Sequence, residues 1–469
     1  MRRKAKIICT IGPASISRKM IGGLITRGMN VVRLNFSHGN HEFHEDAVRK
    51  IREEARRLKK TVAIMQDLQG IKIRVGAIKG GQIELCKGQS VTVRRGSGPG
   101  DENTIFIKYP RLIEASEEGD RILLSDGLIE LQITQKGTDY LRAAVRTGGI
   151  LKEKKGANLP GLRPVDVSFT KKDEADLRLG LRMGVDFVAL SFVRTGGDVL
   201  ALKEFLRRED AEGLPVIAKI ETPQAIRNLD EILPLVEGIM VARGDLGVEI
   251  PPENVPIAQK RLVEKANMAG KFVIIATEML ESMTERPRPT RAETTDVSNA
   301  ILDGADALML SQETSVGKYP LEAVDMMGRI IEETELSLPV KERYRQRGTF
   351  SEAVARAATD AAHSVRAKYI VAFTHSGSTA RLISMLRPEV EIIAFSPSDA
   401  ALRRMSLYWG VLARKIKRLV SMDAQFREVE KELLAEKLAR VGDIIVITAG
   451  TPNKQGTTRF MKLHVIGKE

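Results

Sequence analysis

The chain has 469 residues, of which 43% are hydrophobic and 29% charged, a composition typical of a soluble globular protein with two or three domains. Its two cysteines argue against a disulfide framework or a thiolate metal site. No apolar stretch is long enough to cross a membrane or to act as a secretory signal, so we expect a cytoplasmic protein without a membrane partner. A net charge of +13 fits either a nucleic-acid-binding face or a solvated surface. We favour the solvated surface and expect no nucleic-acid partner, because aromatic residues are only 4% of the chain and no nucleic-acid-binding motif is present.

Eight short apolar runs, most of them followed by an amphipathic stretch, dominate the first 340 residues. Each has the length and β-branched content of a buried parallel strand, and each ends in polar residues. Eight strand–helix units predict a (β/α)8 TIM barrel, whose active site lies at the carboxyl ends of the strands. The runs span residues 6–12, 31–37, 62–67, 187–194, 216–221, 239–245, 272–278 and 307–313.

The pattern changes after the third run. Short segments alternate with period two between glycine-rich turns, which predicts a small inserted β-barrel domain over residues 71–167, placed to act as a lid on the site. The barrel resumes at residue 168, where Thr170 followed by Asp173 predicts a helix start. The expected domains are therefore a barrel over 1–70 and 168–338, the lid, and a C-terminal α/β regulatory domain over 339–469.

The fifth predicted strand ends in two charged residues that stand two positions apart. Lys219 and Glu221 share one face of that strand, and Asp245 ends the next one. Two carboxylates on neighbouring strand ends can hold Mg²⁺, and the nearby lysine suits an anionic phosphate or enolate. The alternative is an ion pair of Lys219 and Glu221 that closes the barrel. Burying charged groups costs free energy, which favours a functional role for them.

Polar residues also alternate along the second strand, where Arg33, Asn35 and Ser37 face one side. Asp67 and Arg74 follow at and beyond the third strand. The guanidinium groups of Arg33 and Arg74 can hold a transferring phosphoryl group, since arginine forks match phosphate oxygens. The alternative is a polar barrel rim without a catalytic role.

Two further motifs are less specific. We interpret His38, His41 and His44 as solvated histidines rather than a metal cluster, because no cysteine or acidic residue stands at ligand spacing. The loop 374–379 joins a strand to a helix in the C-terminal domain, and its hydroxyls and amides can form an anion pocket. An ordinary tight turn explains the loop equally well. The candidate effector residues there are Thr374, Ser376, Gly377, Ser378 and Thr379.

The motifs of this chain closely resemble those of the pyruvate kinase family over its whole length. The residues that carry the resemblance are Lys6-Ile-Ile-Cys-Thr-Ile-Gly-Pro-Ala-Ser, Arg33-Leu-Asn-Phe-Ser-His-Gly, Gly156-Ala-Asn-Leu-Pro-Gly, Ile217-Ala-Lys-Ile-Glu, Val241-Ala-Arg-Gly-Asp-Leu-Gly, Thr277-Glu-Met-Leu-Glu-Ser-Met and Pro287-Arg-Pro-Thr-Arg-Ala-Glu.

The resemblance implies phosphoryl transfer from phosphoenolpyruvate to ADP in glycolysis, giving pyruvate and ATP. It implies that Glu221 and Asp245 bind Mg²⁺ or Mn²⁺ and that a second Mg²⁺ arrives with ADP. Lys219 would neutralise the phosphoryl group and the enolate, and Arg33 would grip phosphate. The amides of Gly244 and Asp245, with the Thr277 hydroxyl, would hold the substrate carboxylate. A relay near Thr277, Ser311 and Glu313 would protonate the enolate. The family further suggests a homotetramer and a phosphorylated allosteric effector whose identity stays open.

Two positions depart from the common family pattern. Many members hold K⁺ near the positions of Asn35, Ser37, Asp67 and Leu68 and carry Glu where this chain has Lys72. A fixed ammonium supplies the same charge as K⁺, so the resemblance is to the K⁺-independent branch and we expect no K⁺ requirement. Gln312 replaces the usual Gly, which puts the relay assignment in doubt.

Two other functions are weaker interpretations. A Mg²⁺-dependent carbon–carbon lyase acting on 2-oxo acids would also use a strand-end Glu and Asp, but it has no need of the Arg33 phosphate grip, the lid or the third domain. A basic RNA-binding or scaffold protein would leave the polar strand ends unexplained.

Overall fold

The computed structural model describes residues 3–160, 168–338, 348–417, 422–450 and 458–468. Eight parallel strands close into a barrel in the order β1-β16-β15-β14-β13-β12-β3-β2, which confirms the predicted (β/α)8 fold. The strands are β1 (Lys6–Thr10), β2 (Met29–Asn35), β3 (Ala63–Asp67), β12 (Phe187–Leu190), β13 (Val216–Ile220), β14 (Gly238–Ala242), β15 (Phe272–Ala276) and β16 (Ala307–Leu310).

Strand residues alternate between the barrel interior and the surrounding helices. Ile217 belongs to the interior cluster, whereas its neighbour Ala218 packs in the outer layer beneath the helices. Lys219 and Glu221 continue the inward series of Ile217, and Arg33 continues that of Val31 in β2. Because side chains alternate along each strand, these charged groups lie inside the barrel at the carboxyl ends of the strands.

Helices of varied length cover the barrel, and several begin at side-chain caps. The predicted helix start is confirmed: the Thr170 hydroxyl accepts the Asp173 amide, and the Asp173 carboxylate accepts the Thr170 amide. The helices are α1 (Arg18–Thr26), α2 (His41–Arg57), α4 (Lys171–Met183), α5 (Gly196–Arg208), α6 (Pro223–Arg227), α7 (Leu229–Ile232), α8 (Arg243–Glu249), α9 (Val255–Met268), α10 (Arg291–Asp303), α11 (Gln312–Ser315) and α12 (Pro320–Leu336), with short η2 (Leu233–Leu235), η3 (Pro252–Asn254) and η4 (Glu281–Thr284).

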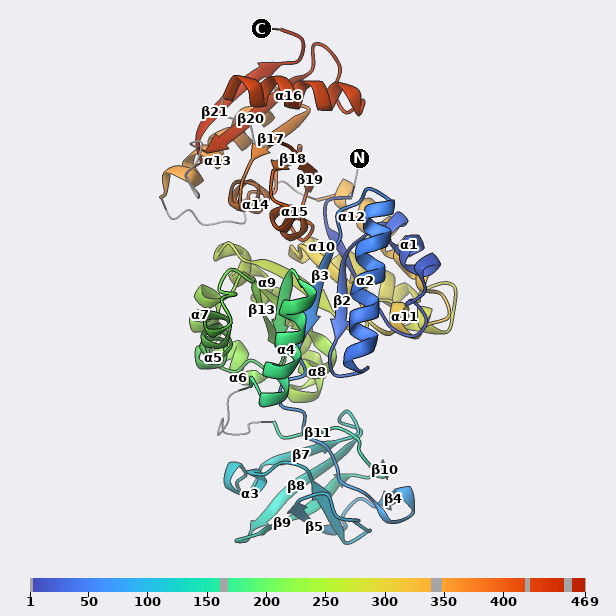
Figure 1. Cartoon of the computed structure of the whole chain (residues 1–469). Helices are drawn as coiled ribbons and strands as arrows, with labels where there is room; N and C mark the ends of the chain where they lie inside the picture. Colours follow the sequence, from blue (N-terminus) through green and yellow to red (C-terminus); the bar gives the residue numbers. More distant parts are fainter. Residues whose placement is uncertain (1–2, 161–167, 339–347, 418–421, 451–457, 469) are drawn as a thin grey trace.

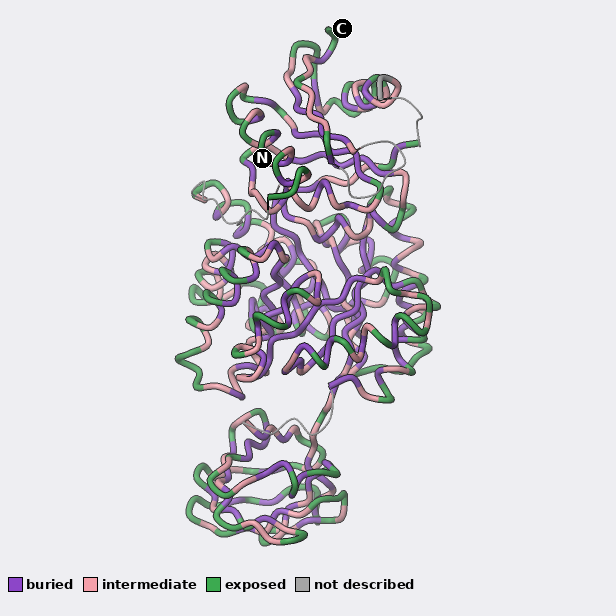
Figure 2. Tube along the Cα trace, turned by 90° about the vertical axis from the view of Figure 1, so that its left-hand side faces the viewer, coloured by how far each residue is buried: buried purple, intermediate pink, exposed green. Residues whose placement is uncertain are grey.

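The segment inserted between β3 and α4 has a buried core of its own and lies beyond one end of the barrel (Figures 1 and 2). Its strands form a six-stranded sheet, β11-β7-β8-β9-β5-β6, and a two-stranded sheet, β10-β4. Because it follows β3 directly, it lies on the side of the strand carboxyl ends. Its elements are η1 (Lys79–Gly81), β4 (Gln82–Leu85), β5 (Ser90–Arg95), β6 (Thr104–Ile107), α3 (Leu112–Ala115), β7 (Arg121–Leu124), β8 (Ile129–Lys136), β9 (Tyr140–Thr147), β10 (Gly149–Lys152) and β11 (Ala157–Asn158).

The C-terminal domain is a five-stranded sheet of order β19-β18-β17-β20-β21, in which only β21 runs antiparallel to its neighbour. It lies at the opposite end of the barrel from the inserted domain (Figure 1). Its elements are α13 (Phe350–Ser364), β17 (Tyr369–Phe373), α14 (Ser378–Met385), β18 (Glu391–Ser396), α15 (Asp399–Met405), β19 (Val411–Lys415), α16 (Met422–Ala435), β20 (Ile444–Gly450) and β21 (Thr458–Val465).

Ion pairs fasten this domain to the amino ends of barrel strands. Arg387 contacts Asp306 at 2.8 Å, just before β16, and Arg403 contacts Asp186 at 2.6 Å, just before β12. The Arg387 guanidinium also lies 4.8 Å from the Trp409 ring centroid. The C-terminal domain is therefore attached far from the strand ends that carry the predicted site.

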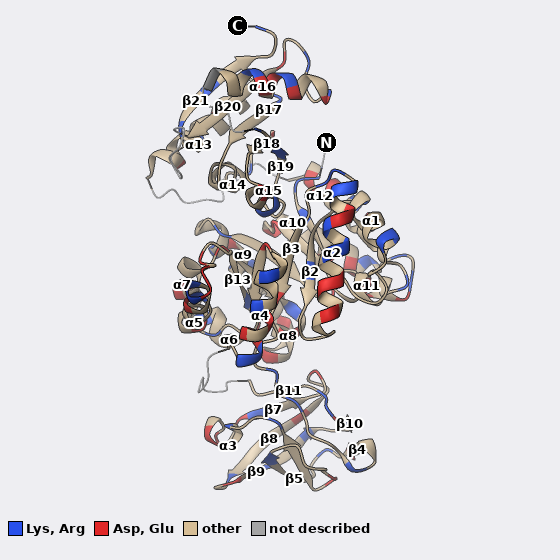
Figure 3. Ribbon diagram, viewed as in Figure 1, with Lys and Arg blue, Asp and Glu red and all other residues tan. Residues whose placement is uncertain are grey.

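The predicted domain boundaries remain predictions, and two of them fall where residues 161–167 and 339–347 lie outside the described part of the chain. Among the described residues, no helix is long and apolar enough to span a membrane. Basic and acidic residues occur together on barrel helices such as α2 in Figure 3.

The buried Arg387–Asp306 pair should contribute more to stability than an exposed pair. Its side chains are 10% and 9% exposed, against 38% and 40% for Arg27–Asp325. Arg387→Ala leaves the Asp306 carboxylate buried without its guanidinium, so we expect the free energy of unfolding to fall by about 3–5 kcal/mol. Arg27→Ala should cost at most about 1 kcal/mol. Calorimetry and urea unfolding would compare the two variants, and equal losses would contradict this account.

Candidate active site

Lys219 occupies the centre of the strand-end cluster. Its Nζ lies 2.9 Å from Glu221 Oε1 and 3.3 Å from Asp67 Oδ1, and it donates a 2.8 Å hydrogen bond to Ser191 Oγ. All four side chains are buried. Burial opposes the ammonium form, but the carboxylates of Asp67 and Glu221 outweigh it and raise the pKa of Lys219 above its usual value. Lys219 is therefore a fixed positive charge in a largely dry site.

Arg33 is the second cation of this cluster. Its Nε donates to Asp67 Oδ2 at 2.6 Å, and its Nη1 donates to Thr10 Oγ1 at 3.2 Å. Burial opposes ionisation of Asp67, but Lys219 and Arg33 outweigh it and lower the pKa of that carboxyl. Asp67 thus holds both cations together at the ends of β2 and β13.

Glu221 is fully buried, and its Oε2 accepts the Phe192 amide at 2.6 Å. Burial raises its pKa to about 7, opposed by Lys219 and reinforced by the nearby charge of Asp245. Phe192 adopts a φ of +53°, a conformation that is rare for a bulky residue and that turns its amide toward Glu221. The backbone is therefore bent to orient this carboxylate.

Glu221 and Asp245 fit a divalent ion of the magnesium type. Glu221 Oε1 is buried beside the ammonium of Lys219 at 2.9 Å and accepts no other hydrogen bond from the described residues. Asp245 lies half-buried in the first turn of α8, where its charge reaches Glu221 and Lys219. No group of three or more His, Cys, Asp or Glu ligands occurs in the described part of the chain. Water and substrate oxygens would complete the coordination, as is usual for Mg²⁺.

Thr277 lies beside this pair with a φ of +71°. Its Oγ1 accepts the Gly244 amide at 2.7 Å and donates to the Ala276 carbonyl at 2.5 Å. Arg243 donates to the Thr277 carbonyl at 2.8 Å and pairs with Asp296 at 2.7 Å, which fixes the strained turn. Strain of this kind persists only where surrounding contacts hold it, and it is common at functional sites.

Ser311 and Glu313 form a separate arrangement. The fully buried Glu313 carboxylate accepts the amides of Leu280 at 3.0 Å and Ser311 at 2.7 Å. Burial raises its pKa although these amides oppose the shift. The Ser311 hydroxyl is buried and has no hydrogen-bond partner among the residues that the structure describes. Within the described residues, no hydrogen bond joins Thr277 to Ser311 or Glu313, so a continuous relay stays a prediction.

Further cations stand near the cluster. Partial desolvation, Arg74 and Lys219 lower the pKa of Lys72, whereas Asp245 opposes this shift. Burial lowers the pKa of His38, and the charges of Lys72, Arg74 and Arg33 reinforce it. Arg74 itself donates to the Lys154 carbonyl of the inserted domain at 2.8 Å. The charge of Arg74 therefore acts on groups near the cluster, while its guanidinium is hydrogen-bonded to the inserted domain.

The residues matched to the K⁺ site gather at the ends of β2 and β3. Asn35 Oδ1 accepts the Ser37 amide at 3.1 Å, and the Phe36 amide donates to the Asp67 carbonyl at 2.9 Å. Leu68, directly after Asp67, is buried. The arrangement brings Asn35, Ser37, Asp67 and Leu68 together around one strand-end turn.

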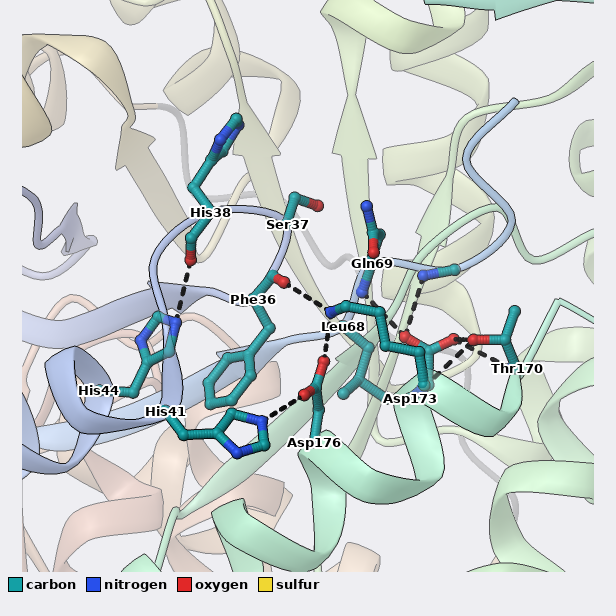
Figure 4. A network of polar contacts seen from close by, with 12 residues as sticks. Phe36, Ser37, His38, His41, His44, Leu68, Gln69, Thr170, Asp173 and Asp176 are labelled. Atoms are coloured by element: carbon teal, nitrogen blue, oxygen red, sulfur yellow. Dashed lines mark hydrogen bonds and ion pairs between the residues drawn. The ribbon is translucent and has the colours of Figure 1, made fainter. Parts of the chain in front are cut away.

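The prediction that the three histidines are solvated is wrong for His44, which is 2% exposed. Its ring stacks on Phe36 at 4.0 Å, and its Nε2 contacts the His38 carbonyl at 3.0 Å (Figure 4). His41 Nε2 lies 2.8 Å from Asp176 Oδ1, a partner supplied by α4. The sequence pattern could not reveal these contacts, because the His41 partner comes from a distant element and the His44 contacts depend on how the loop after β2 folds back. His41 and His44 therefore hold the loop after β2 through these contacts.

The candidate effector loop is a tight strand–helix turn before α14. The Thr374 hydroxyl accepts the Gly377 amide at 2.9 Å, Gly377 has a φ of +94°, and Ser376 Oγ lies 3.3 Å from Ser378 Oγ. Thr379 Oγ1 lies 2.7 Å from Thr458 Oγ1 in β21. Residues 451–457, between β20 and β21, lie outside the described residues.

Ser191 is a site residue that sequence analysis missed. Its hydroxyl bridges Lys219 Nζ and the Leu68 carbonyl, each at 2.8 Å. A serine directly after an apolar run resembles any strand end, so only its place after β12 could have marked it as a candidate.

The fold and the strand-end cluster define a barrel enzyme suited to a metal ion and an anionic, phosphorylated substrate. Residues 2–324 match the family description "Pyruvate kinase, barrel domain", and residues 352–464 match "Pyruvate kinase, alpha/beta domain". The chain therefore belongs to the pyruvate kinase family.

Individual relatives agree with this assignment. The chain is 44% identical to a pyruvate kinase of Sporosarcina psychrophila over 99% of its length and 81% of the relative's. It is 46% identical to that of Staphylococcus aureus strain MRSA252 over 100% of its length and 81% of the relative's. The crystal structure of a pyruvate kinase from Cryptosporidium parvum superposes with a TM-score of 0.92 at 37% identity, covering 99% of this chain and 96% of that one.

Ser191→Ala should weaken catalysis by loosening Lys219. A lost hydrogen bond to a charged group is worth about 1.5–3 kcal/mol, so we expect kcat to fall at least about tenfold. Ser384→Ala is the matched control, because Ser384 is also buried and donates to the Trp409 carbonyl at 2.7 Å in the C-terminal domain. Steady-state kinetics and thermal melting of both variants would check this. Unchanged kcat in folded Ser191→Ala would contradict the role.

Proposed function

We propose that this pyruvate kinase family member transfers the phosphoryl group of phosphoenolpyruvate to ADP, giving pyruvate and ATP. One observation carries the proposal: the buried ammonium of Lys219 lies between Asp67 and Glu221, with Arg33 on the far side of Asp67. Such an array fixes two cationic hydrogen-bond donors at the strand ends, where they can bind the oxygens of an anion. Phosphoryl transfer needs positioning and charge stabilisation of this kind.

Glu221 and Asp245 would hold Mg²⁺ or Mn²⁺, which supplies charge neutralisation at the phosphoryl and enolate oxygens. Arg33 and Lys219 bind the phosphoryl group from the barrel side, and Arg74 grips it from the root of the inserted domain. Lys219 then stays beside the enolate oxygen that remains, where its raised pKa keeps it charged. The cations of this chain therefore lie beside the negative charge at each stage of the reaction.

The substrate carboxylate fits beside α8. The amides of Gly244 and Asp245 lie in the first turn of this helix, and the Thr277 hydroxyl is bonded to the first of them. Donors at a helix start favour an anion. Protonation of the enolate would come from a water or hydroxyl near Thr277, Ser311 and Glu313. The Ser311 hydroxyl is suited to this because it is buried and no group in the described part of the chain already bonds to it.

The assay that tests the function is pyruvate formation from phosphoenolpyruvate and ADP with Mg²⁺. Lys219→Met should lower kcat by about 100-fold or more, since it removes a preorganised charge from a dry site. Lys265→Met is the control: Lys265 is exposed, pairs with Asp230 at 2.9 Å, and should turn over as the unmodified enzyme does. Normal turnover in Lys219→Met would refute the mechanism. A folded enzyme inactive in every buffer would direct attention to a carbon–carbon lyase instead.

We also propose that no K⁺ is required, because Lys72 supplies the monovalent charge. Its ammonium interacts electrostatically with Asp245, Lys219 and Arg74, so it stands near the substrate position. Lys72→Glu should make turnover depend on K⁺, with about a tenfold or larger rise on adding the salt. Lys79→Glu reverses an exposed charge paired with Asp101 and should stay K⁺-insensitive. Strong K⁺ stimulation of the unmodified enzyme would overturn the proposal.

A cytoplasmic homotetramer and a phosphorylated effector at the loop before α14 are further proposals. They rest on the family resemblance and on the hydroxyls and amides of that loop. Thr379 links the loop to β21 through Thr458, so an effector there would contact two elements of the C-terminal sheet.

A further inference from the structure

Two chain segments connect the inserted domain to the barrel, and each meets a buried aspartate of a barrel helix. The outgoing segment, residues 68–70, leaves the end of β3. The returning segment, residues 168–170, leads into α4. Asp173 of α4 is 0% exposed and Asp198 of α5 is 3% exposed. Buried carboxylates need partners for their oxygens.

Asp173 joins both segments through its two oxygens. Oδ1 accepts the amides of Gln69 at 3.0 Å and Gly70 at 3.1 Å, on the outgoing segment. Oδ2 accepts the amide of Thr170 at 2.9 Å and its hydroxyl at 2.6 Å, on the returning one. Figure 4 shows this carboxylate between the loop after β3 and the start of α4. Helix capping uses only the second oxygen, so the first is committed to the outgoing segment.

Asp198 divides its oxygens in the same way. Oδ2 accepts the amides of Arg194 at 2.9 Å and Thr195 at 3.1 Å, which fixes the start of α5. Oδ1 accepts the Ser168 amide at 2.7 Å, on the returning segment. Two neighbouring barrel helices thus each use one carboxylate oxygen for their own start and one for a connection to the inserted domain.

The outgoing segment has little freedom between these contacts and the site. Gly70 has a φ of +66°, and a Cβ there would lie 3.0 Å from the Ser191 carbonyl oxygen. The segment therefore passes tightly over the serine that holds Lys219. Lys72 and Arg74 follow Gly70 by two and four residues, so the position of Gly70 sets where their side chains begin.

We propose that Asp173 and Asp198 are positioning residues that fix the roots of the inserted domain, and that Asp173 thereby places Lys72 and Arg74 over the phosphoryl site. The inference rests on the roles proposed above for Lys72 and Arg74. Neither aspartate touches substrate. Each acts through backbone amides, which tie the inserted domain to the same helices that frame the barrel site.

Hydrogen–deuterium exchange of the full-length enzyme without substrates tests the anchoring by itself. The amides of Gln69, Gly70 and Ser168 should exchange as slowly as that of Leu68, which donates to the Ala189 carbonyl in the barrel. Fast exchange at these three positions would overturn the proposal. This measurement does not depend on the reaction catalysed, so it separates a failed anchor from a failed function.

Asp173→Asn tests the consequence for catalysis. An amide N–H must then face either the donors of Gln69 and Gly70 or those of Thr170, so one of the two connections is lost with little change in shape. We expect KM for phosphoenolpyruvate to rise about tenfold, kcat to fall, and exchange over residues 68–75 to quicken, since small misplacement of catalytic groups is costly. Unchanged KM, kcat and exchange in the folded variant would overturn the role, as would faster exchange with unchanged kinetics.

Glu352→Gln is the matched control. Glu352 is a buried carboxylate that caps α13 in the C-terminal domain, accepting the Thr349 amide at 3.1 Å. The Glu352→Gln substitution should lower the melting temperature without changing KM or the hydrogen–deuterium exchange of residues 68–75. If Asp173→Asn does not fold, Asp198→Asn provides the same comparison at Ser168, and the exchange of the unmodified enzyme still decides the anchoring.

Discussion

The active end of this barrel depends on the balance of charge around Lys219. An ammonium buried without partners would cost several kcal/mol, and the same holds for each carboxylate beside it. Lys219 and Arg33 face Asp67 and Glu221 within 2.6 to 3.3 Å, so two cations and two anions compensate one another in the dry interior. None of the four can be removed without leaving an uncompensated charge, so the removal of any one affects the other three.

This balance has a consequence for what can bind. Because the buried charges cancel, a substrate with several negative charges finds no large surplus of positive charge in the barrel itself. In the proposed reaction, additional positive charge would come from a divalent ion at Glu221 and Asp245 and from cations at the edge. Lys72 and Arg74 lie near the cluster electrostatically, and both belong to the root of the inserted domain. The barrel therefore supplies a nearly neutral base, and the root of the inserted domain adds two further cations beside it.

Patterns with local causes were predictable from the sequence. Apolar runs of strand length indicated the eight strands, and the two-residue period of a strand was enough to place Lys219, Glu221 and Arg33 inside the barrel. The start of α4 at Thr170 was predictable because a capping box lies within four consecutive residues. The roles of Ser191, His44 and Asp173 were not predictable in this way. Each depends on partners between 6 and 123 residues away in the chain, and no local pattern specifies which distant backbone group a buried polar side chain will meet.

The inserted domain must also be anchored to the barrel, and backbone contacts provide the anchor. A domain joined to the barrel by two segments would be free to pivot if those segments were held only by exposed side chains, whose contacts are weak and screened. Asp173 and Asp198 instead accept five hydrogen bonds from amides or a hydroxyl of the connecting segments while fully or almost fully buried. Buried hydrogen bonds to a carboxylate are stronger than neutral ones and leave little angular freedom. Rigidity is thus concentrated at the roots, which fixes the direction in which the chain leaves β3 toward Lys72 and Arg74.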